Sequence, residues 1–252
     1  VGHGSCVVME TPDGRILLYD VGAIRGPGVT SGTIAPFLWH KGITRIDEVF
    51  LSHADLDHFY GLHTLADRFA IGQVTTTPSF VERDIEGVRL TLEKLAERGV
   101  NVRTVYAGGR FFTNELEIHV LHPPAKGPQG VENLRSLVLL VEHEENIILL
   151  TGDIEKQGQT QLRRLPRCPV DVLMAPHHGS PAANTNTLRE WATPKLVVSC
   201  QGRRWDREAE QIYEQAGVPY LSTWEHGAVT VISQRGKVRV RTFRTGKTFE
   251  FE

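Results

Sequence analysis

The sequence predicts an α/β fold in which helices cover layered, mixed sheets, and two observations lead to this class. Short apolar runs of strand length alternate with stretches whose apolar residues recur at helical spacing along the 252 residues. Hydrophobic residues make up 40% and charged residues 23% of the chain, which is ordinary for a globular protein with a buried core. At 252 residues the chain could form one or two such domains.

The first half begins with two strands joined by Thr11-Pro12-Asp13-Gly14, because Pro and Gly suit a tight turn. A glycine-rich loop, residues 22–32, separates this hairpin from the first helix. The expected elements of this half are strands at 5–10, 15–21, 46–51, 74–77, 102–106 and 116–121 and helices at 33–41, 61–69 and 88–98.

The second half starts at the clearest loop of the chain, Pro123 to Gly130, which either marks an internal boundary or borders a site. Strands and helices then alternate, and the chain closes with an antiparallel pair across Gln234-Arg235-Gly236. The expected elements are strands at 137–141, 147–150, 170–175, 196–199, 220–222, 228–232 and 238–243 and helices at 155–164, 185–191 and 207–215.

Several of these strands are followed by side chains of the types that bind metals in proteins. The stretch Ser52-His53-Ala54-Asp55-Leu56-Asp57-His58 places two imidazoles and two carboxylates directly after an apolar run. Asp20, Asp153 and the pair His177-His178 also follow apolar strands, so one rim of the sandwich could gather about seven nitrogen and oxygen ligands. That number exceeds what one tetrahedral zinc uses and suits two metal ions that share a bridging carboxylate. No cysteine accompanies them, which argues against a structural zinc site.

Composition and charge limit the classes of protein to which this chain could belong. The three cysteines form no CxxC pair and are too few for a disulfide framework. The net charge of -2 means that a phosphate-bearing substrate must be attracted locally rather than by the overall field. No apolar run approaches the roughly 18 residues of a membrane span. Because the chain begins Val1-Gly2-His3-Gly4 without an initiator Met, we expect a piece trimmed or cut from a longer protein.

The motif spacing resembles that of metallo-β-lactamase-fold hydrolases, a family whose fold is a four-layer αββα sandwich with mixed sheets. The resemblance implies that residues 1–252 form a single domain of this kind. The family signature HxHxDH appears here as His53-x-Asp55-x-Asp57-His58, followed by Thr151-Gly152-Asp153 and by His177-His178-Gly179-Ser180. More narrowly, the chain resembles the C-terminal hydrolase domain of ComEC-type DNA-internalisation (competence) proteins. The further matching segments are the opening Val1-Gly2-His3-Gly4, the step Leu18-Tyr19-Asp20-Val21-Gly22 and the ending His226-Gly227-Ala228-Val229.

The resemblance implies a centre of two divalent metal ions, Zn or Mn. The implied ligands are His53 and Asp55 for the first ion, Asp57, His58 and His177 for the second, and Asp153 between the two. His178 could replace His177 in that role, and Asp20 would orient a ligand histidine by accepting its hydrogen bond. Where the family carries a third histidine for the first ion, this chain offers only Asn133 and Ser136 to support the site.

For the reaction, the resemblance implies hydrolysis of DNA, in single-stranded form, by a hydroxide that bridges the metals. Asp57 and His178 would take part in catalysis, and His178 or Ser180 would position or protonate the leaving group. Arg203 and Arg204 are the nearest cations in the sequence for contacting a phosphodiester, although a solvated loop explains them equally well.

The implied partner is the membrane channel portion of the same protein, which would attach this soluble domain to the outer face of the cytoplasmic membrane. Two alternatives stay open: a free-standing hydrolase of a small phosphodiester or ester, and a non-catalytic binding or gating domain with a degraded metal site. Histidines outside the motifs, His3 among them, are expected at the surface or in ordinary hydrogen bonds. The alternating Lys237, Arg239 and Arg241 favour a solvated strand face over a DNA track.

Overall fold

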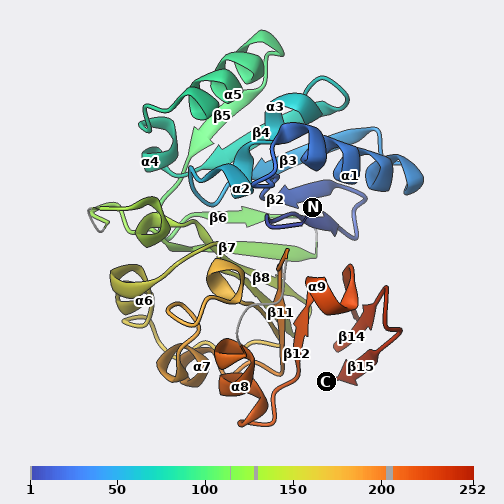
Figure 1. Ribbon diagram of the computed structural model, residues 1–252, viewed down its shortest axis with the longest axis vertical. Coiled ribbons are helices and arrows are strands. Elements are labelled where there is room, and N and C mark those ends of the chain that lie inside the picture. Colours follow the sequence, from blue (N-terminus) through green and yellow to red (C-terminus); the bar gives the residue numbers. More distant parts are fainter. Residues whose placement is uncertain (1, 114, 128–129, 203–206) are drawn as a thin grey trace.

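The computed structural model describes residues 2–113, 115–127, 130–202 and 207–252, and Figure 1 shows its first sheet with α1 to α5 above a second sheet with α6 to α8. In the first sheet β1 is antiparallel to β2, and the remaining neighbours are parallel. Its strands, in spatial order, are β1 (Val7–Glu10), β2 (Ile16–Tyr19), β3 (Arg45–Phe50), β4 (Ala70–Thr76) and β5 (Asn101–Thr104).

The second sheet has the spatial order β12-β11-β10-β9-β8-β7-β6. Its strands are antiparallel from β6 to β9 and parallel from β9 to β12, so both sheets are mixed. The strands are β6 (Arg110–Phe112), β7 (Leu116–His122), β8 (Val138–His143), β9 (Asn146–Leu150), β10 (Val172–Met174), β11 (Leu196–Ser199) and β12 (Tyr220–Ser222).

Helices cover the outer face of each sheet. The helices on the first sheet are α1 (Pro27–His40), α2 (Leu56–Phe59), α3 (Leu62–Leu65), α4 (Pro78–Val81) and α5 (Glu86–Glu97). The later helices are α6 (Lys156–Leu162), α7 (Asn186–Ala192), α8 (Glu208–Glu214) and α9 (Thr223–His226), with 3₁₀ turns η1 (Glu132–Arg135) and η2 (Pro176–Gly179). None of the helices described has both the length and the apolar character needed to cross a bilayer.

Three clusters of apolar side chains hold the helices and sheets together, one on the outer face of each sheet and one between the two sheets. Leu18 of β2 packs with Ile34 of α1 and Leu62 of α3 on the outer face of the first sheet. The neighbouring side chains Leu17 and Tyr19 point the other way and join residues of β7 and β8 between the sheets. Because β2 is buried on both faces, its sequence is a continuous apolar run and does not alternate between apolar and polar residues.

The second sheet is covered in the same way on its outer face, where Leu140 and Leu173 pack against Leu162 of α6, Trp191 of α7 and Tyr213 of α8. Burying one such side chain stabilises the fold by about 1.5–3 kcal/mol relative to leaving it exposed. The arrangement is therefore helix, sheet, sheet, helix, which confirms the predicted four-layer α/β sandwich with mixed sheets.

A small third sheet completes the fold, formed by β13 (Val229–Gln234), β14 (Lys237–Thr242) and β15 (Thr248–Phe251). Val238 and Val240 of β14 pack against Leu196 and Leu221 of the second sheet. Arg239 on the opposite face of β14 pairs with Glu250, with 2.9 Å between Nη2 and Oε2. This pairing supports the predicted solvated face of the strand.

Some predicted element boundaries were wrong. Helix α1 begins at Pro27, inside the predicted glycine-rich loop, because Pro suits the first helical turn. Burial of Thr30 and Ile34 offsets the destabilising effect of Gly28 on the helix. The predicted helix at 61–69 is only the single turn α3, and α2 forms within the polar stretch after β3. Strands β6 and β15 were not predicted.

Candidate metal centre

Four parallel strands bring the polar motifs to one edge of the sandwich. In the first sheet β2 ends just before Asp20 and the adjacent β3 ends just before Ser52 and His53. In the second sheet β9 precedes Asp153 and the adjacent β10 precedes His178. Because the carboxyl ends of parallel neighbours point the same way, each sheet delivers two loops to the site.

The first group of potential metal ligands consists of His53, His58 and Asp153, all buried, whose donor atoms lie within 4.8 Å of one another. His58 Nε2 lies 3.1 Å from Asp153 Oδ1, and His53 Nε2 lies 4.0 Å from Asp153 Oδ2. Among the described residues, the fully buried His53 Nε2 makes no well-aligned hydrogen bond, and Asp55 Oδ2 lies 3.4 Å from it. A buried nitrogen in this state is costly unless another group, such as a metal ion, binds it.

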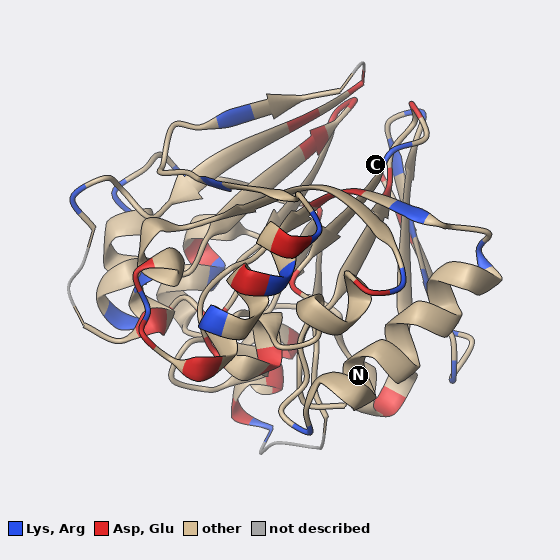
Figure 2. Ribbon diagram, turned by 90° about the horizontal axis from the view of Figure 1, so that it is seen from above, with Lys and Arg blue, Asp and Glu red and all other residues tan. Residues whose placement is uncertain are grey.

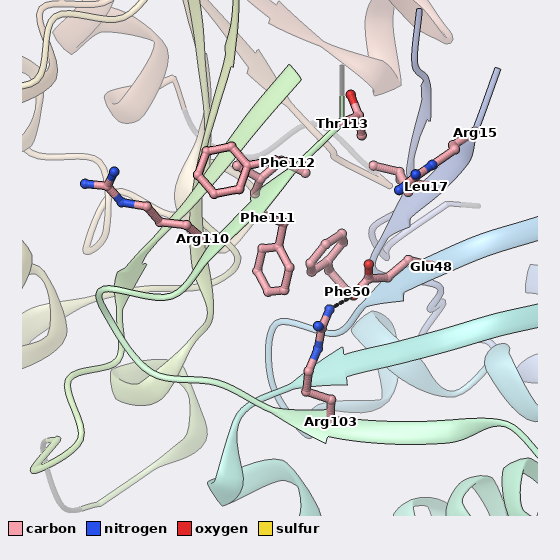
Figure 3. A pocket seen from close by; sticks show the side chains of 10 residues that line it. Arg15, Leu17, Glu48, Phe50, Arg103, Arg110, Phe111, Phe112 and Thr113 are labelled. Atoms are coloured by element: carbon pink, nitrogen blue, oxygen red, sulfur yellow. Dashed lines mark hydrogen bonds and ion pairs between the residues drawn. The ribbon is translucent and has the colours of Figure 1, made fainter. Parts of the chain in front are cut away.

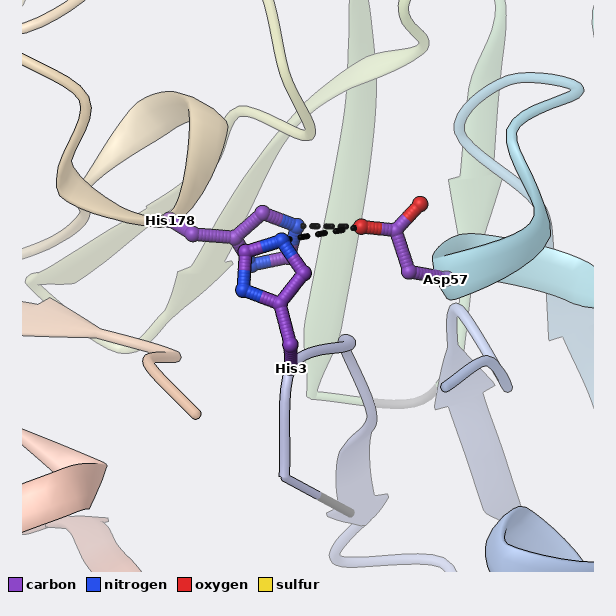
Figure 4. Close-up of side chains that lie close together, drawn as sticks. All are labelled: His3, Asp57 and His178. Carbon is purple, nitrogen blue, oxygen red and sulfur yellow. Dashed lines mark hydrogen bonds and ion pairs between the residues drawn. The ribbon is translucent and has the colours of Figure 1, made fainter. Parts of the chain in front are cut away.

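The second group consists of His3, Asp57 and His178, whose donor atoms also lie within 4.8 Å of one another (Figure 4). His178 Nε2 lies 3.1 Å from Asp57 Oδ2 and 3.7 Å from Asp153 Oδ2. The two groups are contiguous, because His58 Nε2 and His178 Nε2 are 3.1 Å apart.

The distances within each group fit divalent metal binding. With zinc–nitrogen and zinc–oxygen bonds of about 2.0–2.2 Å, two donor atoms on one tetrahedral ion lie roughly 3.3 Å apart. His58 Nε2 and Asp153 Oδ1 in the first group, and His178 Nε2 and Asp57 Oδ2 in the second, are each 3.1 Å apart, close to that value. Carboxylate and imidazole donors, without thiolate, suit zinc and manganese.

Hydrogen bonds behind the site aim the imidazoles at it. His58 donates from Nδ1 to Asp20 Oδ2 at 2.7 Å, and Ser52 donates to the same carboxylate through its backbone N–H and its hydroxyl. His178 donates from Nδ1 to the carbonyl of Cys200 at 2.8 Å. In both rings Nε2 is left facing the other potential metal ligands, as is usual for metal-binding histidines.

Charge sets the protonation states of the metal-free site. Burial alone would lower the pKa of His58, but the carboxylates of Asp153 and Asp20 outweigh it and raise that pKa well above its usual value. Burial likewise opposes a raised pKa for His178, yet Asp153 and the hydrogen bond to Asp57 raise it. Burial raises the pKa of Asp57 and of Asp153, but the surrounding imidazoles dominate and leave both well below the usual range.

We therefore predict that metal affinity rises with pH through the neutral range. Because the pKa of His58 is raised well above its usual value, this ring binds a proton more readily in the metal-free protein, and metal binding must displace that proton. Each displaced proton changes the apparent affinity by about tenfold per pH unit. Calorimetric titration of Zn²⁺ in buffers of different ionisation enthalpy would measure the protons released; zero release at neutral pH would contradict this account.

The remaining predicted site residues lie around the two groups. Asp55 Oδ2 is 3.4 Å from His53 Nε2 on a half-exposed side chain. Ser136 Oγ accepts a hydrogen bond from the backbone N–H of Asp153 at 3.2 Å, whereas the half-buried Asn133 in η1 belongs to neither group. Ser180 directly follows η2. Arg203 and Arg204 lie outside the described residues.

The structure brings His178, rather than His177, to Asp57. Both residues have left-handed backbone angles, with φ of 50° and 52°, and this tight turn sends their side chains apart. His177 points outward, with 36% of its side chain exposed and Nδ1 3.2 Å from Glu155 Oε2. Its Nε2 stays 3.8 Å from Asp153 Oδ2, at the border of the first group.

Sequence reasoning missed His3, which was expected at the surface. A lone histidine in the segment before the first strand carries no ligand pattern, and only the flanking Gly2 and Gly4 hint at a close backbone approach. Its position depends on contacts with residues more than fifty positions away in the chain, such as Asp57.

A separate cavity of about 310 Å³ lies between strands β2, β3 and β5 of the first sheet and β6 and β7 of the second, and includes none of the predicted site residues (Figure 3). Arg103 within it pairs with Glu48 at 2.6 Å and lies over the ring of Phe111 at 4.5 Å. No residue of the two ligand groups lines this cavity, so it is separate from the metal centre.

A four-layer αββα sandwich with buried histidines and aspartates at the ends of its central strands is typical of a superfamily of metal-dependent hydrolases. The chain belongs to the metallo-beta-lactamase superfamily, whose family model matches residues 1–202. That membership implies divalent metal binding.

Similar proteins agree with the predicted resemblance to ComEC-type competence proteins. The chain is 30% identical over 216 residues to ComE operon protein 3 of Bacillus subtilis (strain 168), covering 83% of this chain and 27% of that protein. It is 26% identical over 255 residues to Competence protein ComA of Neisseria gonorrhoeae, covering 98% and 33%. The chain thus spans about a third or less of these curated relatives.

Among solved structures, CmlA, a diiron beta-hydroxylase from Streptomyces venezuelae, is similar with a TM-score of 0.54 and 16% sequence identity. The similarity covers 88% of this chain and 51% of that one. At this identity the likeness concerns the fold alone.

Proposed function

We propose that this chain is a phosphodiesterase with two divalent metal ions, Zn or Mn, that cuts single-stranded DNA during DNA uptake. The observation that carries the proposal is the contiguous pair of ligand groups around Asp153, each with two imidazoles and one carboxylate. The competence relatives support DNA as the substrate. Attachment to a membrane channel portion of the same protein, on the outer face of the cytoplasmic membrane, is part of this proposal.

When bound, such ions polarise the phosphodiester and lower the pKa of the attacking water. The chain's own residues hold the geometry. Asp20 and Ser52 fix the ring of His58, and the carbonyl of Cys200 fixes the ring of His178. His178 Nδ1 bonds to this carbonyl and its Nε2 faces Asp57 Oδ2 at 3.1 Å, so we assign His178 to metal binding rather than to protonation of the leaving group.

Ser180 and His177 are the remaining candidates for contact with the leaving group. His177 is half-exposed beside Asp153, and the backbone N–H of Ser180 donates a hydrogen bond to the carbonyl of His177 at 2.8 Å. Figure 2 shows Lys and Arg interspersed with Asp and Glu over the described chain, so the attraction for phosphate would be concentrated at the metal centre.

The test is cleavage of end-labelled single-stranded and duplex DNA by the purified chain with Mn²⁺ or Zn²⁺. We expect metal-dependent products that disappear with a chelator and in Asp57→Ala. Failure to cut DNA while hydrolysing a small phosphodiester would favour the small-substrate alternative. Metal binding without hydrolysis of either substrate would favour a binding or gating domain.

A further inference from the structure

His3 belongs to the second ligand group by its position. Its Nε2 lies 3.5 Å from Asp57 Oδ2, and its ring centroid lies 4.5 Å from that of His178 (Figure 4). We infer that His3 is itself a ligand of the metal ion held by Asp57 and His178. The inference rests on the proposed metal centre and does not depend on the identity of the substrate.

The backbone around His3 is built to hold this residue in place. Its carbonyl accepts a hydrogen bond from Ile24 at 2.8 Å, and the backbone N–H of Ser5 donates to the carbonyl of Asp57 at 2.9 Å. The segment that carries His3 is thus tied directly to the segment that carries Asp57.

Two glycines make this close approach possible. A Cβ atom at Gly4 would lie 2.2 Å from the carbonyl oxygen of Gly22, and one at Gly22 would lie 2.1 Å from the carbonyl carbon of Asp57. Three backbone segments therefore stack without intervening side chains. Such stacking fixes the position of His3 before any ion binds, which lowers the entropy cost of ligation.

His3 also makes the two groups alike in composition. With it, the second group offers two imidazole nitrogens and one carboxylate oxygen, as His53, His58 and Asp153 do in the first. Without it, the Asp57 group would contain a single imidazole. Two imidazoles and a carboxylate are a common donor set for zinc and other divalent transition metals.

The experiment compares His3→Ala and His3→Gln with His40→Ala, which changes an exposed histidine at the end of α1. Zn²⁺ binding to the metal-free full chain is measured by calorimetry and chelator competition, and Co²⁺ binding by visible absorption. Both His3 variants should lose more than about 100-fold in affinity for one of two ions and show an altered Co²⁺ spectrum, while the control matches the wild type.

Wild-type affinities for both ions in His3→Ala would overturn the assignment. So would retention in His3→Gln alone, because Gln keeps a hydrogen-bond donor but is a poor ligand. The side chain is 25% exposed, so folding of His3→Gln, checked by circular dichroism, is expected to survive. A wild type that binds two ions without cutting DNA would defeat the proposed function and leave this inference standing.

Discussion

Asp153→Ala is expected to abolish metal-dependent cleavage, lowering its rate by at least about 10³-fold. Asp153 is the carboxylate shared by the two ligand groups: its oxygens lie 3.1 Å from His58 Nε2, 3.7 Å from His178 Nε2 and 4.0 Å from His53 Nε2. Its removal would take an anion from the centre and leave neighbouring imidazoles to repel one another. The rate is measured on labelled DNA at saturating Mn²⁺.

The matched control is Asp171→Ala, which removes another buried carboxylate. Asp171 accepts a hydrogen bond from the backbone N–H of Ile147 and pairs with Lys195, outside both ligand groups. We expect this control to cut DNA at the wild-type rate at a temperature where it is folded. Wild-type cleavage by Asp153→Ala would contradict the shared role of this carboxylate.

Asp20→Asn is expected to lower metal affinity about 10–100-fold and to destabilise the metal-free fold by about 3–5 kcal/mol. The fully buried carboxylate accepts hydrogen bonds from His58 and twice from Ser52, and an uncharged amide cannot accept all three. Asn is chosen because the backbone at this position has φ 59°, which Asn tolerates better than Ala.

Chemical denaturation at about pH 6 is the suitable measurement of this stability loss. The pKa of His58 is raised by folding, so its ion pair contributes fully below the unfolded pKa and less as pH rises through the folded value. The control Asp171→Asn should lose stability without losing metal affinity. Equal metal affinity in Asp20→Asn and the wild type would show that Asp20 does not orient His58.

Most of the site was predictable because its residues directly follow strands. Periodicity located β2, β3, β9 and β10. Parallel pairing brings Asp20 and His53 to one edge of the first sheet, and Asp153 and His178 to one edge of the second. The strands therefore carried the prediction of a metal centre, and the family resemblance carried that of the four-layer fold.

What sequence could not decide depends on local backbone angles and long-range packing. His177 and His178 are adjacent and chemically identical, and only the two left-handed residues of η2 decide which one faces Asp57. His3 reaches the site because glycines allow three distant segments to stack, a relation without sequence periodicity. Likewise α1 starts early because tertiary burial outweighs the glycines in its first turns.

The central claim is a two-metal centre around Asp153, and anomalous diffraction from crystals grown with Mn²⁺ tests it most directly. Data collected at the manganese absorption edge should show two peaks about 3.5–4 Å apart on either side of the Asp153 carboxylate. One peak, or none, at full metal saturation would contradict a two-metal centre.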